Sequence, residues 1–169
     1  MPLSPDVIKA AILDAFQEVP YPGDDLLVVD NSGRDPECRE IATAFRGRDW
    51  RTVSLQTLRE NAEALPLLSP SAFRYYLPAY MIGCAEAYYD LDVVPDSVVF
   101  HLTPPKERMG WEWEFFWSRV QDFTAAQRHA IRLFLELMEH YECCDWASED
   151  MAPPEDGAKF AVEFWKQWL

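Results

Sequence analysis

The fold is organised around residues 68–89, which read LSPSAFRYYLPAYMIGCAEAYY. Ser69 is a favourable helix N-cap, and Pro70 suits the first helical position because no backbone N–H is needed there. Apolar residues then recur every three or four positions, at Phe73, Leu77, Met81 and Cys84. This spacing predicts a helix with one buried face. Pro78 lies inside the run, and because its ring crowds the preceding turn we expect a kink or a break there.

Similar patterns predict further helices on both sides of this stretch. Each starts at a Ser, Asp or Thr that can cap a helix, or at a proline, and apolar residues follow at helical spacing. The clearest of them covers residues 125–142. The predicted starts are Ser4-Pro5, Asp35-Pro36, Ser54, Thr124 and Pro153-Pro154.

Three stretches are ambiguous. Residues 26–29 are compatible with a short strand or an extended loop, and the β-branched residues within 91–102 are compatible with a short strand that has no strong partner. Residues 109–120, MGWEWEFFWSRV, fit both periodicities, and we interpret them as a helix. At most one short two-stranded β element is expected.

Composition is typical of a globular protein. Of 169 residues, 49% are hydrophobic and 14% aromatic, which is enough to build one self-sufficient core. The sequence therefore predicts a single globular domain over residues 1–169, with a mainly α fold: a compact bundle of six to eight helices.

The net charge of -14 restricts the class of partner. Nucleic acid is not expected as a ligand, because phosphate binding needs a basic surface. A basic protein partner fits the charge better, although an acidic surface also serves solubility alone.

The expected location is the cytoplasm. No stretch approaches the 18 apolar residues of a transmembrane helix, and no secretory leader pattern is visible, so no membrane association is expected. Four irregularly spaced cysteines do not form a disulfide framework, which is typical of a reducing compartment. No cofactor is expected, since the six glycines do not form a phosphate-binding loop.

Several motifs together resemble a bacterial family known only as a domain of unknown function. The most specific is Leu-Ser-Pro-x-Ala-Phe-Arg-Tyr-Tyr-Leu-Pro-Ala-Tyr at residues 68–80, and the others lie at residues 22–25, 40–50 and 123–135. The resemblance covers roughly residues 7–140. It implies no activity and no catalytic residue, since the family has none assigned.

A metal site is one candidate chemistry. His140 and Cys143 lie about one helical turn apart and offer ligands that zinc prefers. A second ligand pair with suitable spacing is missing, so the alternative is an ordinary helix end. No signature of nucleophilic catalysis is present either.

Two sets of residues are candidates for protein interaction. The first is Arg74, Tyr75, Tyr76 and Tyr80, since Tyr and Arg are enriched at interface hot spots. Helical spacing favours packing in the core for these tyrosines, with Arg74 paired to Asp24 or Asp25. The second set lies in the acidic stretch 136–156, which has eight acids and no Lys or Arg, and comprises Glu149, Asp150, Glu155 and Asp156.

The aromatic cluster within residues 111–117 is a third interaction candidate. It could form a peptide-binding groove or a dimer interface, and the alternative is ordinary core. Our first hypothesis for function is a non-catalytic protein-interaction module with an acidic surface, for example an immunity or antitoxin-like protein that masks a basic effector. The other hypotheses are a small hydrolase or metal-dependent enzyme, and a structural accessory subunit.

Overall fold

In the computed structural model, which describes residues 3–168, the central element is the helix α4 (Pro70–Ala87). Its N-terminus is capped as predicted, because the backbone N–H of Ala72 donates to the Ser69 hydroxyl at 3.1 Å. The helix continues through Pro78, so a break at that residue is excluded. Twelve of its residues are buried, which makes α4 the centre of the molecule.

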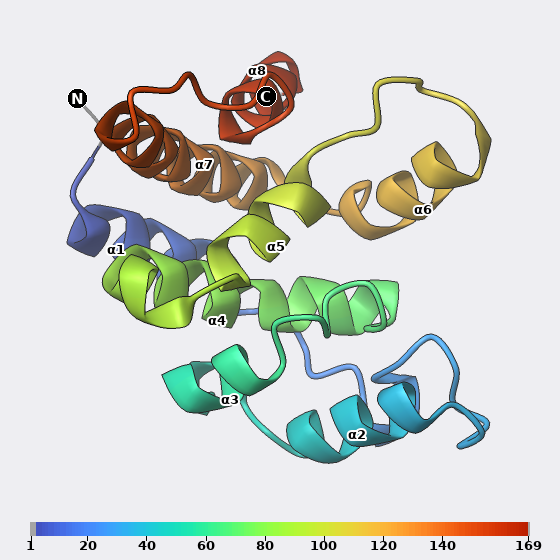
Figure 1. The fold of residues 1–169 in the computed structure, drawn as a ribbon. Coiled ribbons are helices and arrows are strands. Elements are labelled where there is room, and N and C mark those ends of the chain that lie inside the picture. Colours follow the sequence, from blue (N-terminus) through green and yellow to red (C-terminus); the bar gives the residue numbers. More distant parts are fainter. Residues whose placement is uncertain (1–2, 169) are drawn as a thin grey trace.

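Within residues 3–168 the chain forms eight α-helices and three short 3-10 turns (Figure 1). The predicted mainly α fold is confirmed. In this part of the chain, the only β structure is an isolated antiparallel bridge between Val28 and Leu68. The other elements are α1 (Pro5–Phe16), η1 (Asp24–Leu26), α2 (Pro36–Phe45), η2 (Trp50–Thr52), α3 (Leu55–Glu60), η3 (Tyr88–Leu91), α5 (Val94–Leu102), α6 (Gly110–Val120), α7 (Ala125–Ser148) and α8 (Ala158–Gln167).

One element type and two boundaries differ from the sequence predictions. The β-branched stretch 91–102 contains the helix α5 and no strand. The helix α7 continues past residue 142 to Ser148, so much of the acidic stretch 136–156 is helical and not a loop. The last helix begins at Ala158 and not at Pro153-Pro154.

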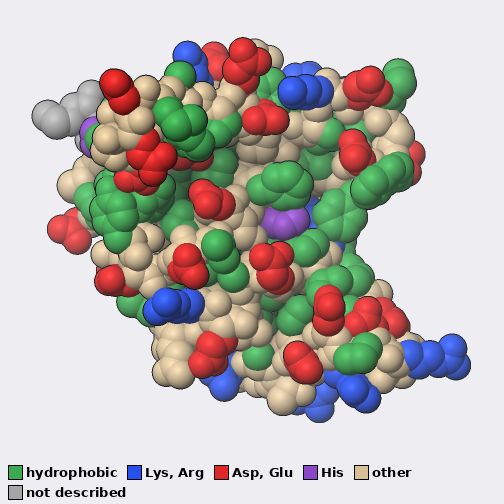
Figure 2. Space-filling view, in the orientation of Figure 1, with side chains coloured by type: hydrophobic (Ala, Val, Ile, Leu, Met, Phe, Trp, Pro, Cys, Tyr) green, Lys and Arg blue, Asp and Glu red, His purple; other side chains and the backbone are tan. Residues whose placement is uncertain are grey.

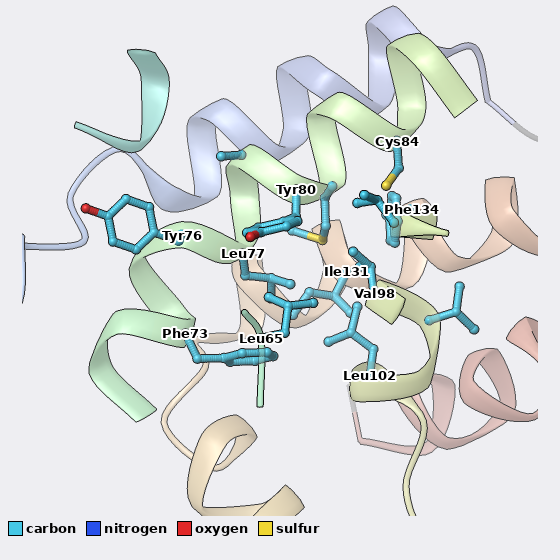
Figure 3. Packing of buried hydrophobic residues seen from close by; sticks show 14 of the residues in the cluster. Leu65, Phe73, Tyr76, Leu77, Tyr80, Cys84, Val98, Leu102, Ile131 and Phe134 are labelled. Atoms are coloured by element: carbon cyan, nitrogen blue, oxygen red, sulfur yellow. The ribbon is translucent and has the colours of Figure 1, made fainter. Parts of the chain in front are cut away.

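Helices α1, α4 and α7 pack against one another at the centre, and α8 covers α7 (Figure 1). The helices α5 and α6 contact α4 from a further side. Side chains from α4, α5, α7 and the segment before α4 meet in one core (Figure 3). Labelled members of that core are Leu65, Phe73, Leu77, Cys84, Val98, Leu102, Ile131 and Phe134.

Two tyrosine hydroxyls fasten α4 to the segments around α2 and α3. Tyr76 donates toward the carbonyls of Phe45 and Arg48, each at 2.8 Å, and Tyr80 donates to the carbonyl of Asn61 at 2.7 Å. These carbonyls lie at or just beyond helix ends, where backbone acceptors lack helical partners. The tyrosines therefore satisfy helix ends while their rings fill the core.

Candidate ligand-binding cleft

The loop from residue 103 to 109 separates α5 from α6 and opens the molecule on one side. Thr103-Pro104-Pro105 ends α5, because consecutive prolines cannot continue a helix. Gly110 then starts α6 with a φ of 81°, a backbone conformation that favours glycine. The loop between these points runs out from the body of the molecule (Figure 1).

One face of α6 packs on the C-terminal helix. Trp113 and Trp117 stack with ring centres 5.4 Å apart, Trp117 contacts Trp168 at 5.0 Å, and Phe116 contacts Phe164 at 5.6 Å. Part of the predicted aromatic cluster therefore belongs to the core. Trp111 does not, since 74% of its surface is exposed.

An open cleft of about 1150 Å³ lies between α5, the following loop, α6 and the segment that leads into α8. Phe100, Met109 and Trp111 line it, and each is close to three-quarters exposed. Soluble proteins seldom expose several large apolar side chains together unless the patch binds something. Figure 2 shows green hydrophobic and red acidic side chains gathered over the face where Figure 1 places α5 and α6.

Acidic side chains dominate the charged lining of the cleft. The exposed base Lys106 lies 4.0 Å from the carboxylate of Asp156, so its charge is partly balanced within the protein. The remaining acidic lining residues are Asp96, Glu107, Glu112 and Glu142. A positively charged ligand group would therefore be attracted to the rim.

Glu142 has a structural role at the rim of the cleft. Its carboxylate accepts a hydrogen bond of 3.0 Å from the backbone N–H of Ala158 at the start of α8. A carboxylate there satisfies an unpaired N–H and interacts favourably with the helix dipole. Burial raises the pKa of the Glu142 carboxyl.

The floor of the cleft holds two polar side chains, Arg119 and His101. Arg119 is 5% exposed and donates from Nη2 to the carbonyls of Pro66 and Leu68, each at 2.9 Å. Burial lowers the pKa of Arg119 to about 10, which still leaves it charged at neutral pH. Burial, with the nearby Arg119 charge, lowers the pKa of His101 to about 4, so its ring is neutral at pH 7.

The first set of interaction candidates lies in and beside the core. Tyr76 and Tyr80 are fully buried and Tyr75 is 4% exposed, so their side chains contribute to packing. Arg74 is half-buried, and its Nε is buried without an acceptor among the described residues. Among the described residues Arg74 forms no ion pair with either expected partner, Asp24 or Asp25. Asp24 instead accepts hydrogen bonds from the Tyr21 hydroxyl and the Gly47 backbone N–H.

The second set lies on the surface between α7 and α8. Glu149, Asp150, Glu155 and Asp156 are all exposed. Asp156 lines the cleft, and the other three do not. The acidic segment thus borders the cleft at one residue.

The metal candidates are not assembled into a site. His140 and Cys143 are both exposed, and the thiol near His140 is that of Cys144, with Sγ 3.9 Å from Nε2. Cys144 is four residues after His140 and lies on the same helix face, whereas the predicted ligand Cys143 is three residues after it. Over residues 3–168, no group of three or more His, Cys, Asp or Glu side chains is placed to hold a metal ion.

Sequence reasoning missed Phe100, His101 and Arg119. The nearest indication in the sequence is the aromatic cluster of residues 111–117, for which a peptide-binding groove is one of the predicted alternatives. Arg119 offered a further one, since a cation inside an otherwise apolar run must either reach solvent or find polar partners.

Comparison with known proteins places the chain in one group. A family model with the description "Family of unknown function (DUF6714)" matches residues 5–169. No curated protein and no solved structure matches the chain. None of the helices described here is both long and apolar enough to cross a membrane.

Proposed function

The chain belongs to this family of unknown function, and we propose from its cleft that it is a non-catalytic protein-interaction module. The cleft receives a partner segment that is both apolar and basic. The observation that carries the proposal is the joint exposure of Phe100, Met109 and Trp111 at 73%, 73% and 74% around one hollow. Large apolar anchors of this kind supply most of the energy of protein interfaces.

The size of the cleft supports a chain segment as the occupant. Pockets for small molecules have volumes of roughly 300 to 1,000 Å³, and they enclose most of the ligand. This cleft is larger, at about 1150 Å³, and it is open. It therefore suits several residues of a polypeptide better than one compact molecule.

The charge of the rim supports a basic partner. The exposed carboxylates of Asp96, Glu107 and Glu112 are part of a net charge of -14, and the field of these negative charges speeds the encounter with a cationic protein. An immunity or antitoxin-like role in the bacterial cytoplasm is a concrete form of this proposal, with the domain masking a basic effector.

The enzyme hypothesis has less support from the cleft. Thr103 lines the cleft, and its hydroxyl donates a hydrogen bond of 2.7 Å to the carbonyl of Val99. A hydroxyl engaged in this way is not activated by a neighbouring base, as nucleophilic catalysis requires. The accessory-subunit hypothesis differs only in that its partner stays bound.

A partner-capture experiment tests the proposal. The wild-type protein, the variant Phe100→Ala/Trp111→Ala and the control Leu26→Ala are used as baits in lysate of the source organism, at low and moderate salt. Leu26 is 59% exposed and does not line the cleft, so it controls for loss of exposed apolar area. We expect a basic protein that binds wild type and the control but not the double variant.

A second pair of baits separates the cleft from the acidic segment. Glu107→Lys/Glu112→Lys reverses charge at the cleft, and Glu149→Lys/Asp150→Lys reverses it outside the cleft. The first is expected to lose the partner and the second to keep it, with weaker binding at higher salt. Equal capture by wild type and Phe100→Ala/Trp111→Ala would contradict the proposal.

A further inference from the structure

Arg119 is a buried cation without a counter-charge. It is 5% exposed, and no carboxylate lies within ion-pair distance of it anywhere in residues 3–168. An uncompensated charge in such a place is costly, and proteins normally pair it. The missing anion is therefore the first clue to what the cleft receives.

Only part of the Arg119 guanidinium has a structural role. Nη2 donates to the two carbonyls of the segment before α4, and the group lies 3.6 Å from the centre of the Phe115 ring. Nε is buried without an acceptor, and Nη1 has no hydrogen bond to the described residues. Guanidinium N–H groups match the geometry of a carboxylate better than that of any other common anion except phosphate.

His101 adds a second donor on the same floor. Its ring is neutral at pH 7, and neither ring nitrogen is hydrogen-bonded within the described residues. A neutral imidazole carries one N–H, which can donate to an oxygen of a bound anion. Both polar groups of the floor thus carry N–H donors that have no acceptor among the described residues.

We propose that Arg119 and His101 form a carboxylate-binding point, and that it receives the C-terminal carboxylate of a partner protein whose last residue is apolar. This inference rests on the proposed function and identifies the partner segment. Phe115, which lies beside the guanidinium and lines the cleft, contacts the terminal side chain. Recognition of a chain terminus by fixed N–H donors is a known mode of peptide binding.

The rim decides between a chain terminus and a small free acid. A small anion has to pass Asp96, Glu107 and Glu112, which repel it. A terminus preceded by Lys or Arg is attracted by the same carboxylates while its own carboxylate reaches Arg119. The separation of charge in the cleft, acidic at the rim and cationic at the floor, matches a segment of this kind.

Two matched sets of synthetic peptides test the inference on the full chain. Each peptide has two Lys residues upstream and ends in Phe, Leu or Trp, with a free carboxylate in one set and a carboxamide in the other. We expect the free acids to bind about tenfold more tightly or better, because hydrogen bonds to charged groups are the stronger ones. Isothermal titration calorimetry measures both sets.

Each outcome separates the inference from the proposed function. Equal binding of acids and amides overturns the carboxylate site but remains consistent with the proposed function, a cleft that binds an apolar and basic segment. Binding of neither set also overturns the terminus, and the capture experiment with Phe100→Ala/Trp111→Ala then decides the function independently. If 3-phenylpropionate and decanoate bind as tightly as the acid peptides, the site is one for small acids, and the chain terminus is wrong.

A spectroscopic readout on the wild-type protein avoids variants that fail to fold. The ring resonances of His101, assigned by their loss in His101→Gln, are expected to shift on addition of the acid peptide and not of the amide. Arg119→Lys keeps the charge but not the planar set of donors, so a folded Arg119→Lys protein is expected to lose the preference for the acid. An unchanged preference in that variant would contradict the role of Arg119.

Discussion

Two aromatic regions of the molecule use the same kinds of residue in opposite ways. Around α4, Tyr76 and Tyr80 are fully buried. Around the cleft, Phe100 and Trp111 are 73% and 74% exposed. Both regions contain an arginine within the aromatic sequence, so the residue types alone do not distinguish a sealed core from an open site.

The difference lies in how polar groups are satisfied. The hydroxyls of Tyr76 and Tyr80 reach backbone carbonyls at 2.7 to 2.8 Å, so both are satisfied within the fold, and in this region only the half-buried Arg74 has a buried Nε without an acceptor among the described residues of α4. In the cleft, Arg119 keeps unpaired donors beside exposed rings. Buried rings with satisfied hydroxyls stabilise the fold, whereas unpaired donors beside exposed apolar surface indicate a binding site.

The largest expected effect is in the buried region around Tyr76 and Tyr80 of α4, which we call the sealed region; the cleft around Phe100 and Trp111 is the open region. Tyr80→Ala removes a fully buried ring together with the hydrogen bond to Asn61, and we expect it to lower the free energy of unfolding by about 4 kcal/mol. Denaturant unfolding followed by circular dichroism measures this. Tyr80→Phe is the control, with an expected loss of about 1.5 kcal/mol from the unpaired carbonyl alone. A loss below 1 kcal/mol in Tyr80→Ala would show that the region is not the centre of stability.

Much of the sealed region was predictable because local rules and packing agree there. Ser69 and Pro70 mark the start of α4, and the apolar spacing that follows matches the buried face. Local rules failed where tertiary packing decided the outcome. The β-branched residues of α5 form a helix because Val94, Val98 and Leu102 share one buried face, which outweighs their intrinsic strand preference.

The cleft was only partly predictable. The cluster of residues 111–117 splits between core and surface, because Trp117 meets Trp168 of the far C-terminal segment and Trp113 stacks on Trp117, whereas Trp111 is exposed. No local pattern encodes that choice. The same holds for Arg119, whose lack of a counter-charge depends on which carboxylates the whole fold brings near it.

The next effect concerns acid sensitivity at the cleft floor. The pKa of His101 is about 4 in the folded protein against an ordinary value of 6.5, so the unfolded chain binds more protons between these values. The stability that the neutral ring contributes is therefore present above pH 6.5 and is lost as the pH falls toward 4. From pH 7 to pH 5 we expect a loss of about 2 kcal/mol.

His101→Gln isolates this contribution from other titrating groups, such as Glu142, which respond equally in both proteins. The variant is expected to lose less stability than wild type between pH 7 and pH 5 in urea unfolding. If the free energies of unfolding of the two proteins changed in parallel with pH, the His101 ring would be as well solvated as the residues at the rim. The contrast between a buried floor and an exposed rim would then be wrong.

A smaller effect is expected at the turn between the two regions. Asp92 joins η3 to α5 with φ 55° and ψ -116°. Residues other than glycine adopt this backbone conformation only with strain. Asp92→Gly is expected to raise the free energy of unfolding by about 1 kcal/mol, since relief of strain exceeds the entropy that glycine adds to the unfolded chain. Thermal unfolding of the two proteins checks the sign. A destabilised variant would show that the Asp92 side chain has a stabilising role that outweighs the strain.

The smallest effect on stability gives the sharpest test of the comparison. Trp111→Ala removes the largest aromatic side chain of the open region, yet 74% of its surface is already in water, so the free energy of unfolding is expected to change by less than about 0.5 kcal/mol. Binding of the acid peptides is expected to weaken by at least tenfold in the same variant, because Trp is the residue most often found at interface hot spots. The two variants would then differ in what they lose. Tyr80→Ala lowers the free energy of unfolding, and Trp111→Ala lowers the affinity for the acid peptides. If Trp111→Ala instead destabilised the protein by 2 kcal/mol or more, its ring would be packed in solution and the cleft would be a closed part of the core.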